Sequence, residues 1–387
     1  MLRSIGPQAC DEPRAESATT VLNACDGAPA NIQALTPFRA GWNQRDLERK
    51  LGIENSVNLA SNENALGCSP AVTRALRTQT ELVSRYPDSA GQALKQALHK
   101  FYGVDTDRII LGNGSNDVLD LLARTFLRPG TSALHSQYGF AVYPLVARAS
   151  GAESIEVTAK NFGHDASAMV AAIRSDTRLV FIANPNNPTG TLLEPELVVR
   201  VLERVPRHVL VVLDEAYDEF LPAAQRSAAH RYLDKYPNLI VVRTFSKAYG
   251  LAGLRVGYAF ANPCVCDLVN RVRQPFNVNA PAQAAAVAAL SDQDFIKRSA
   301  ELVRDGMRQV ERGLGRLGLE HIPSAGNFLS FRVPHADTIF QHMLQQGVIV
   351  QPLVNYGMAN HLRVSIGLES QNQRFLSALS AALTVSN

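Results

Sequence analysis

One short stretch indicates the fold: Val209-Leu-Val-Val-Leu-Asp-Glu-Ala-Tyr217. Its first five residues are valine and leucine, a composition typical of a strand that is buried on both faces of a parallel sheet. The apolar run stops abruptly at Asp214. We therefore expect this carboxylate at the carboxyl edge of the sheet, where open α/β proteins bind their ligands.

A second apolar run ends in the same way, in a turn that prolines stiffen: Leu179-Val-Phe-Ile-Ala-Asn-Pro-Asn-Asn-Pro-Thr-Gly190. Asn187 is the amide that this turn would present. From Ile109 to Phe260, short apolar runs alternate with helical stretches such as 117–126 and 196–205. This alternation predicts an α/β fold with a large domain, in which helices flank a mostly parallel sheet.

The last third of the chain has a different rhythm, typical of a smaller α+β domain. It combines a long helix, short strands and a closing helix, and two further helices are predicted near the start of the chain. The predicted helices are 44–51, 70–82 and 294–317, and the predicted short strands are 327–333, 348–353 and 362–366. The predicted division is a flexible lead at 1–34, an N-terminal arm and part of the small domain at 35–75, the large domain at 76–285, and the small C-terminal domain at 286–387.

A third segment carries the candidate nucleophile: Arg243-Thr-Phe-Ser-Lys-Ala-Tyr-Gly-Leu-Ala-Gly-Leu-Arg-Val-Gly-Tyr258. Lys247 can form a Schiff base only if its amine is partly deprotonated, which requires desolvation or a neighbouring charge. Thr244, Ser246 and Arg255 could converge on a phosphate dianion between small glycines. The segment therefore suits an aldehyde cofactor with a phosphate tail, although an ordinary basic loop after a buried strand is the simpler alternative. Asp214 would then keep a pyridine nitrogen protonated.

Composition favours a soluble globular enzyme over other classes. The chain has 387 residues, of which 46% are hydrophobic and 19% charged, so it can bury a large core. A net charge of +3 without a basic block does not favour nucleic acid, and neither a membrane span nor an apolar signal core is visible. The scattered histidines and cysteines predict no metal site, and five cysteines without ligand spacing indicate reduced thiols in a cytoplasmic protein.

Taken together, these segments resemble the fold-type I pyridoxal-phosphate enzymes of aminotransferase class I/II, and most narrowly the histidinol-phosphate aminotransferases. The narrower likeness depends on five further motifs, which follow the order of the family from about residue 35 to the end. They are Leu59-Ala-Ser-Asn-Glu-Asn-Ala-Leu-Gly67, Arg85-Tyr-Pro-Asp88, Leu111-Gly-Asn-Gly-Ser-Asn116, Arg273-Gln-Pro-Phe-Asn-Val-Asn279 and Tyr356-Gly-Met-Ala-Asn-His-Leu-Arg-Val-Ser-Ile-Gly367. The resemblance implies an aspartate-aminotransferase-like fold with pyridoxal 5'-phosphate as cofactor.

The resemblance also implies roles for individual residues. Lys247 matches the lysine that holds the cofactor as a Schiff base, and Asp214 matches the partner of the pyridine nitrogen. Tyr217 and Asn187 match the pair that hydrogen-bonds the ring hydroxyl. After release, the Lys247 amine would act as general base and general acid at the substrate Cα.

The cofactor phosphate has its own expected residues. Ser115 and Asn116 lie in a strand-to-helix turn whose backbone amides would bind the phosphate at a positive helix end. Thr244, Ser246 and Arg255 would complete this cup. A tight turn without any ligand is the alternative for the glycine-rich segment.

Three more residues match positions of the family. Tyr138 matches the aromatic ring stacked on the cofactor, and Tyr86 matches a tyrosine that enters the site of the neighbouring subunit. Arg363 matches the arginine that grips the anionic end of the substrate. The resemblance thus implies a homodimer with shared sites. For Tyr138 and Tyr86 the alternative is ordinary packing of the ring with the hydroxyl exposed to water, and for Arg363 it is a surface salt bridge.

The substrate pocket departs from the family near the start of the chain. Phe38 and Arg39 lie in Thr36-Pro-Phe-Arg-Ala-Gly-Trp42, where the family usually carries Pro-Tyr followed by Pro-Gly-Lys. Alanine also replaces the usual proline after Asn64. We expect Asn64, Phe38 and Arg39 to contact substrate, and the loss of one phenolic hydroxyl would change preference by about 1 to 3 kcal/mol.

The expected reaction is transamination between histidinol phosphate and 2-oxoglutarate in histidine biosynthesis. A paralogue acting on an aromatic or other anionic amino acid is one alternative, and a threonine-phosphate-decarboxylase-like enzyme is another. A non-catalytic regulator that binds the cofactor is disfavoured because the lead of about 34 residues is short for a DNA-binding module. A nucleotide-binding dehydrogenase would lack the visible absorption of a bound cofactor aldehyde.

Overall fold

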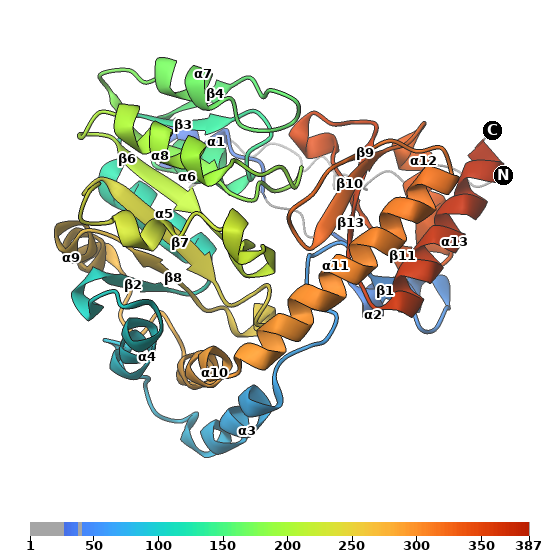
Figure 1. Ribbon diagram of the computed structural model, residues 1–387, viewed down its shortest axis with the longest axis horizontal. Coiled ribbons are helices and arrows are strands. Elements are labelled where there is room, and N and C mark those ends of the chain that lie inside the picture. Colours follow the sequence, from blue (N-terminus) through green and yellow to red (C-terminus); the bar gives the residue numbers. More distant parts are fainter. Residues whose placement is uncertain (1–26, 38–40, 387) are drawn as a thin grey trace, which may run out of the picture.

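The structure is a computed structural model that describes residues 27–37 and 41–386. Two bodies are visible in Figure 1: a large sheet covered by helices on both faces, and a smaller sheet with its own helices. The long helix α11 (Gln293–Arg316) begins beside α10 (Ala280–Ser291) under the large sheet and runs across to the smaller body.

The large sheet has seven strands in the order β2-β8-β7-β6-β5-β3-β4. Only β8 runs antiparallel to its neighbours, so the predicted mostly parallel sheet is confirmed. The strands are β2 (Ile109–Gly112), β3 (Ser132–Ser136), β4 (Glu153–Val157), β5 (Thr177–Ala183), β6 (Leu210–Asp214), β7 (Leu239–Thr244) and β8 (Gly257–Phe260).

Both faces of this sheet are buried, as the continuous apolar runs predicted. Along β6, Val211 and Leu213 pack into one hydrophobic core, whereas Val212 packs into a second core on the opposite face. Burial of such side chains contributes about 1.5 to 3 kcal/mol each. The helices that supply the covering layers are α3 (Pro70–Gln79), α4 (Gln92–Tyr102), α5 (Ser115–Phe126), α6 (Val142–Ala149), α7 (Ala166–Ala171), α8 (Pro195–Arg204), α9 (Pro263–Val272) and α10.

The smaller body contains a four-stranded antiparallel sheet and a two-stranded parallel pair. The strand orders are β12-β13-β10-β9 and β1-β11. Its elements are α2 (Gln44–Leu51), β1 (Val57–Asn58), α11, β9 (His321–Ile322), β10 (Phe328–Arg332), α12 (Ala336–Gln345), β11 (Val348–Ile349), β12 (Gln351–Pro352), β13 (His361–Ser365) and α13 (Glu369–Ser386). A separate core joins Leu47 and Leu59 from early in the chain to the C-terminal elements.

Short 3-10 segments connect these elements, and they form part of the loops around the sheet edge. They are η2 (Thr80–Leu82), η3 (Thr106–Arg108), η4 (Asp218–Phe220), η5 (Ala223–Gln225), η6 (Ala229–Tyr232), η7 (Ala252–Leu254) and η8 (Val354–Tyr356). The single helix predicted at 70–82 is therefore α3 followed by η2. The single strand predicted at 348–353 is two strands, because β11 pairs with β1 and β12 pairs with β13.

The predicted division of the chain into domains stays a prediction. Val72 of α3 packs into the core of the large sheet, so the structure joins α3 to the large body. Residues 1–26 of the predicted lead lie outside the described part. Residues 27–34 include a short helix, α1 (Ala30–Gln33), whose Asn31 donates to the carbonyl oxygens of Arg148 at 2.9 Å and Ala149 at 3.1 Å.

Candidate active site

Lys247 lies in the loop that follows β7, at the carboxyl edge of the large sheet. Its Nζ donates to the carbonyl oxygen of Ser61 at 3.2 Å and lies 5.7 Å from the centre of the Tyr217 ring. Desolvation, with repulsion from Arg363 and Arg255, lowers the pKa of Lys247 to about 8. At neutral pH a useful fraction of this amine is therefore unprotonated, as a Schiff-base lysine requires.

Asp214 is the last residue of β6 and is buried. Its carboxylate accepts from the Tyr143 hydroxyl at 3.0 Å and from the backbone amide of Ala216 at 3.2 Å. These donors are neutral, and desolvation raises the pKa of Asp214 to about 6. A protonated ring nitrogen would give this carboxylate the positive partner that the described side chains do not provide by direct contact.

Tyr217 and Asn187 come from neighbouring strand ends. The Tyr217 hydroxyl accepts from Asn62 Nδ2 at 3.0 Å, and burial raises the pKa of Tyr217 to about 12. Asn187 Oδ1 accepts from Arg363 Nη1 at 2.5 Å. Because its amide oxygen is taken, Asn187 keeps its Nδ2 group for donation to another acceptor.

Arg363 lies on β13 and points towards the large sheet rather than into solvent, which excludes the surface salt bridge considered from sequence. Its Nη2 donates to the carbonyl oxygen of Ala60 at 2.6 Å, and its guanidinium lies 5.3 Å from the centre of the Phe328 ring. Burial lowers the pKa of Arg363, and its buried Nε has no partner among the described residues. A buried cation with an unused donor is suited to an anionic ligand.

A cup suited to an anion lies where α5 begins. The close approach of backbone and side chains depends on glycine, because a Cβ at Gly257 would lie 2.4 Å from the amide nitrogen of Ser115. A Cβ at Gly114 would lie 2.3 Å from an Arg255 guanidinium nitrogen. Arg255 also donates to Ser246 Oγ at 3.3 Å. A helix-end amide, a hydroxyl and a guanidinium thus lie close together, and these are the groups that bind phosphate in proteins.

Two other residues predicted for this cup take different positions. The Thr244 hydroxyl accepts from the backbone amide of Ser246 at 3.1 Å, so it shapes the turn that carries Ser246. Asn116 is exposed on the first turn of α5. Their predicted contacts with phosphate stay predictions.

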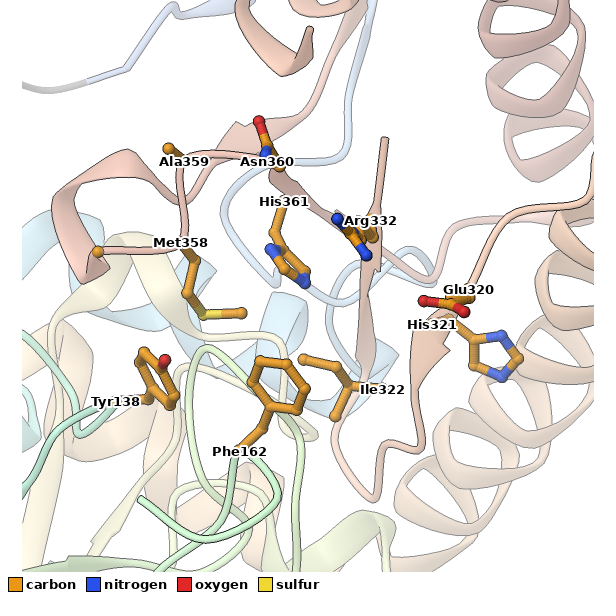
Figure 2. A pocket seen from close by; sticks show the side chains of 11 residues that line it. Tyr138, Phe162, Glu320, His321, Ile322, Arg332, Met358, Ala359, Asn360 and His361 are labelled. Atoms are coloured by element: carbon orange, nitrogen blue, oxygen red, sulfur yellow. The ribbon is translucent and has the colours of Figure 1, made fainter. Parts of the chain in front are cut away.

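Tyr138 lies at the junction of the two bodies. Its ring packs with Phe162 at a centroid distance of 5.7 Å, beside a small cluster formed by Ile322, Leu353 and Met358. Figure 2 shows Tyr138 and Phe162 on one side of a cavity of about 460 Å³, with Met358 and His361 of the small body opposite. Stacking on a cofactor ring stays a prediction for Tyr138.

Tyr86 is strongly exposed, at 83%, and stacks on Phe276 with ring centroids 4.6 Å apart. Val83 on the same segment is 73% exposed. An exposed aromatic pair beside an exposed valine is typical of a surface that contacts another protein. This arrangement is compatible with the predicted entry of Tyr86 into a neighbouring site.

The three residues predicted for the substrate pocket near the start of the chain differ in outcome. Asn64 donates to the carbonyl oxygen of Ala248 at 2.8 Å and to Ser299 Oγ at 2.9 Å. It therefore anchors the backbone next to Lys247, and contact with substrate stays a prediction. Phe38 and Arg39 lie outside the described residues.

Sequence reasoning missed a segment that contacts three candidate residues in succession. The carbonyl of Ala60 binds Arg363, the carbonyl of Ser61 binds Lys247, and the side chain of Asn62 binds Tyr217. The carbonyls carry no side-chain signal, and only the Asn62 motif could have marked the segment. Tyr143, the donor to Asp214, was also missed because it lies within a helix.

Other kinds of site find no support in the described part of the chain. Residues 27–37 and 41–386 contain no group of three or more histidine, cysteine, aspartate or glutamate side chains placed to hold a metal ion. None of the helices in these ranges is both long and apolar enough to cross a bilayer.

The fold and site define the class: a fold-type I, aspartate-aminotransferase-like enzyme with a lysine of lowered pKa and a buried carboxylate at the carboxyl edge of its large sheet. The sequence profile described as aminotransferase class I and II matches residues 54–379, and the chain belongs to this family. It is therefore an aminotransferase, as predicted.

Similar proteins support this family assignment. Histidinol-phosphate aminotransferase 2 of Nitrosospira multiformis is 54% identical over 94% of this chain and 93% of its own length. Histidinol-phosphate aminotransferase of Methylobacillus flagellatus is 53% identical over 92% and 98%. The crystal structure of histidinol-phosphate aminotransferase from Sinorhizobium meliloti in complex with pyridoxal-5'-phosphate matches with a TM-score of 0.87 and 28% identity, over 94% of this chain and all of that one.

Proposed function

We propose that this aminotransferase transfers the amino group of histidinol phosphate to 2-oxoglutarate in histidine biosynthesis. Relatives that are more than half identical over nearly the whole chain bear that name. Pyridoxal 5'-phosphate is the cofactor, as predicted. The main structural support for this chemistry is that Lys247 and Asp214 are both buried without a direct opposite charge among the described residues. The pKa of Lys247 is lowered and the pKa of Asp214 is raised.

Lys247 is proposed to act both in cofactor binding and in proton transfer. Lys247 would hold the cofactor through its aldehyde carbon, and the lysine amine, once free, would remove the Cα proton of the substrate as a base and deliver it to that cofactor carbon as an acid. A pKa of about 8 lets this amine alternate between base and acid near neutral pH. When bound, the cofactor supplies an electron-poor ring that accepts the electron pair released at Cα.

Other side chains hold the cofactor in place. Asp214 would pair with the ring nitrogen and keep it protonated, while Tyr217 and Asn187 would donate to the ring oxygen. The cup formed by Ser246, Arg255 and the amides at the start of α5 would bind the phosphate. Ser115, Asn116 and Thr244 complete this cup in our proposal, and Tyr138 stacks against the ring.

Arg363 binds the anionic end of each substrate in turn. Its guanidinium is fixed by Asn187 and Ala60, so it presents a preorganised cation to phosphate in one half-reaction and to carboxylate in the other. The remaining contacts proposed for substrate are those of Asn64, Phe38 and Arg39.

The enzyme is proposed to act as a homodimer in the cytoplasm. Tyr86 and its stacking partner Phe276 form the exposed surface that would reach the second subunit. Cys68, Cys264 and Cys266 are free thiols, which agrees with a reducing compartment.

A panel of amine donors tests the substrate assignment. Each donor is offered with 2-oxoglutarate, and glutamate formation is measured together with release of carbon dioxide. We expect histidinol phosphate to exceed the aromatic amino acids at least about tenfold in kcat/KM, since recognition of its phosphate contributes more than 1.4 kcal/mol. Faster reaction of an aromatic donor would favour the paralogue suggested by Phe38, and carbon dioxide release without an oxo acid would favour the decarboxylase.

A further inference from the structure

The hydroxyl of Tyr217 has one hydrogen-bond partner within the described part of the chain. It accepts from Asn62 Nδ2 at 3.0 Å, and no described residue accepts its proton. Tyr217 is 3% exposed and Asn62 is 1% exposed, so bulk water does not complete the pairing. Since buried hydroxyl protons are normally paired, the proton of Tyr217 is available to a group bound in the site.

Ser365 determines which end of the Asn62 amide faces Tyr217. The Ser365 hydroxyl accepts from the backbone amide of Asn62 at 2.8 Å, and its own proton goes to Asn62 Oδ1 at 3.0 Å. The amide oxygen is therefore used, and the amide nitrogen is left to donate to Tyr217. Asn62 holds this position with a φ of 55°, in the left-handed region that asparagine tolerates better than most residues.

We propose that Asn62 is a positioning residue for transamination: held by Ser365, it makes the hydroxyl of Tyr217 a donor towards the ring oxygen of the cofactor. The inference rests on the role proposed above for Tyr217. A phenol that accepts one hydrogen bond becomes a stronger donor of its own, because bonds in a chain polarise one another. Ser365 lies two residues from Arg363 on β13, so one strand both grips the substrate anion and orients this donor.

The surroundings of Tyr217 keep its proton in place. The charged or titratable groups that face it are Lys247 above the ring, Arg363, Asp214 and Tyr356. None of them takes the Tyr217 proton through a hydrogen bond, and none is hydrogen-bonded to Asn62. A double variant that also lacks the Tyr217 hydroxyl therefore tells whether a changed cofactor spectrum comes from the Asn62–Tyr217 bond.

The test replaces Asn62 in the holoenzyme by alanine and by aspartate. The visible absorption of the bound cofactor is then followed as a function of pH. Alanine removes the donor, whereas an aspartate carboxylate would accept the Tyr217 proton and withdraw it from the site. Because a weaker donor stabilises an anionic ring oxygen less, we expect the pH midpoint to rise in Asn62→Ala and to rise further in Asn62→Asp, by about one unit, a tenfold change in the equilibrium constant.

Matched variants separate this inference from the proposed function. Tyr217→Phe must itself raise the midpoint, and an unchanged midpoint there would contradict the role of Tyr217. The double variant Asn62→Ala/Tyr217→Phe should equal Tyr217→Phe, because Asn62 acts through the phenol and alanine adds no charge. Asn238→Ala is the control, since it loses one buried hydrogen bond, to Val209 at 2.8 Å, at the far end of β7.

Two outcomes overturn the inference. In the first, the Asn62 variants shift the midpoint no more than Asn238→Ala while Tyr217→Phe shifts it. In the second, Asn62→Ala keeps its full effect when the Tyr217 hydroxyl is absent. Ser365→Ala tests the inference if the Asn62 variants do not fold. It keeps the Asn62 side chain but removes the hydroxyl that holds its amide and its backbone, and we expect a smaller rise that also vanishes in the Tyr217→Phe background.

Discussion

Two clusters of buried charge lie side by side at the same sheet edge, and they are organised in opposite ways. Arg243 of β7 is 3% exposed and binds Glu215 at 2.5 Å, Asp218 at 2.9 Å and Glu219 at 3.2 Å. One residue before Glu215, Asp214 accepts only from neutral donors, and four residues after Arg243, Lys247 donates only to a carbonyl within the described chain.

The difference suggests that one cluster stabilises the fold while the other is suited to a reaction. In the Arg243 cluster, a buried cation is surrounded by carboxylates, an arrangement that is strongly destabilised when one partner is removed. Desolvation raises the pKa of Glu215 to about 6 and that of Glu219 to about 7 beside Arg243, and it also raises the pKa of Asp214 and lowers that of Lys247. What differs is that Lys247 and Asp214 have no direct opposite charge among the described residues, which suits groups that exchange protons or await a charged ligand.

Replacement of Lys247 by alanine should have the largest effect. The variant loses the covalent anchor and the base together, so transamination should fall by at least about 10⁴-fold. Single-turnover kinetics with reconstituted enzyme would measure this loss. Lys235→Ala is the matched control, because that exposed lysine contacts Glu203 at 3.6 Å and lies outside the site. Activity above about a hundredth of wild type would refute the assignment of Lys247.

Replacement of Arg243 by methionine should affect stability more than chemistry. Three buried acidic groups would lose their cation, which should lower the free energy of unfolding by about 3 to 5 kcal/mol. Denaturant unfolding of the cofactor-free protein measures this value. The control, Arg108→Met, removes an ion pair with the exposed Asp234 and should cost no more than about 1 kcal/mol. Equal losses in the two variants would show that the Arg243 cluster is not a special support.

Replacement of Asp214 by asparagine should stabilise the cofactor-free protein, whereas replacement of Arg243 should destabilise it. The pKa of Asp214 is raised from 3.8 to about 6, so the folded protein binds this proton more tightly than the unfolded chain does. The resulting stability is present below pH 4 and is lost as the pH rises through 6. Above pH 6 the asparagine variant, without cofactor, should therefore be more stable than wild type by about 3 kcal/mol.

The same variant should transaminate roughly 10²- to 10³-fold more slowly, the range found when one preorganised electrostatic partner is lost. Thermal unfolding of the cofactor-free protein between pH 4 and pH 8 tests the predicted change in stability, and steady-state rates test the predicted loss of activity. A stability difference that does not change with pH would contradict the raised pKa of Asp214.

The sequence predicted the large sheet well because both faces of its strands are buried. Alternating positions such as Val211 and Val212 enter two different cores, and this leaves a continuous apolar run that is visible without any structure. Asp214 was visible for the same reason, since it ends such a run, and Asn187 was visible because it lies in the proline-stiffened turn that follows another run. The fold class, the family and the cofactor are confirmed.

The contacts across the chain could not be predicted in this way. Asn62 and Tyr143 meet their partners only in the folded protein: Asn62 lies in a motif that does not reveal its partner, and Tyr143 has no local pattern that distinguishes it from an ordinary aromatic residue. The carbonyls of Ala60 and Ser61 are invisible in principle, because every residue has one. The split of the strand predicted at 348–353 likewise depends on which partner strands lie on either side.

The bonds between the start and the end of the chain have a consequence during synthesis. Arg363 meets Ala60 and Ser365 meets Asn62, pairs that are each separated by 303 positions. During synthesis, Lys247 and the two strands that flank it, β7 and β8, leave the ribosome long before Arg363 is added. The newborn polypeptide can thus assemble its main sheet early, yet it becomes a competent catalyst only when its last few dozen residues emerge and close on its first.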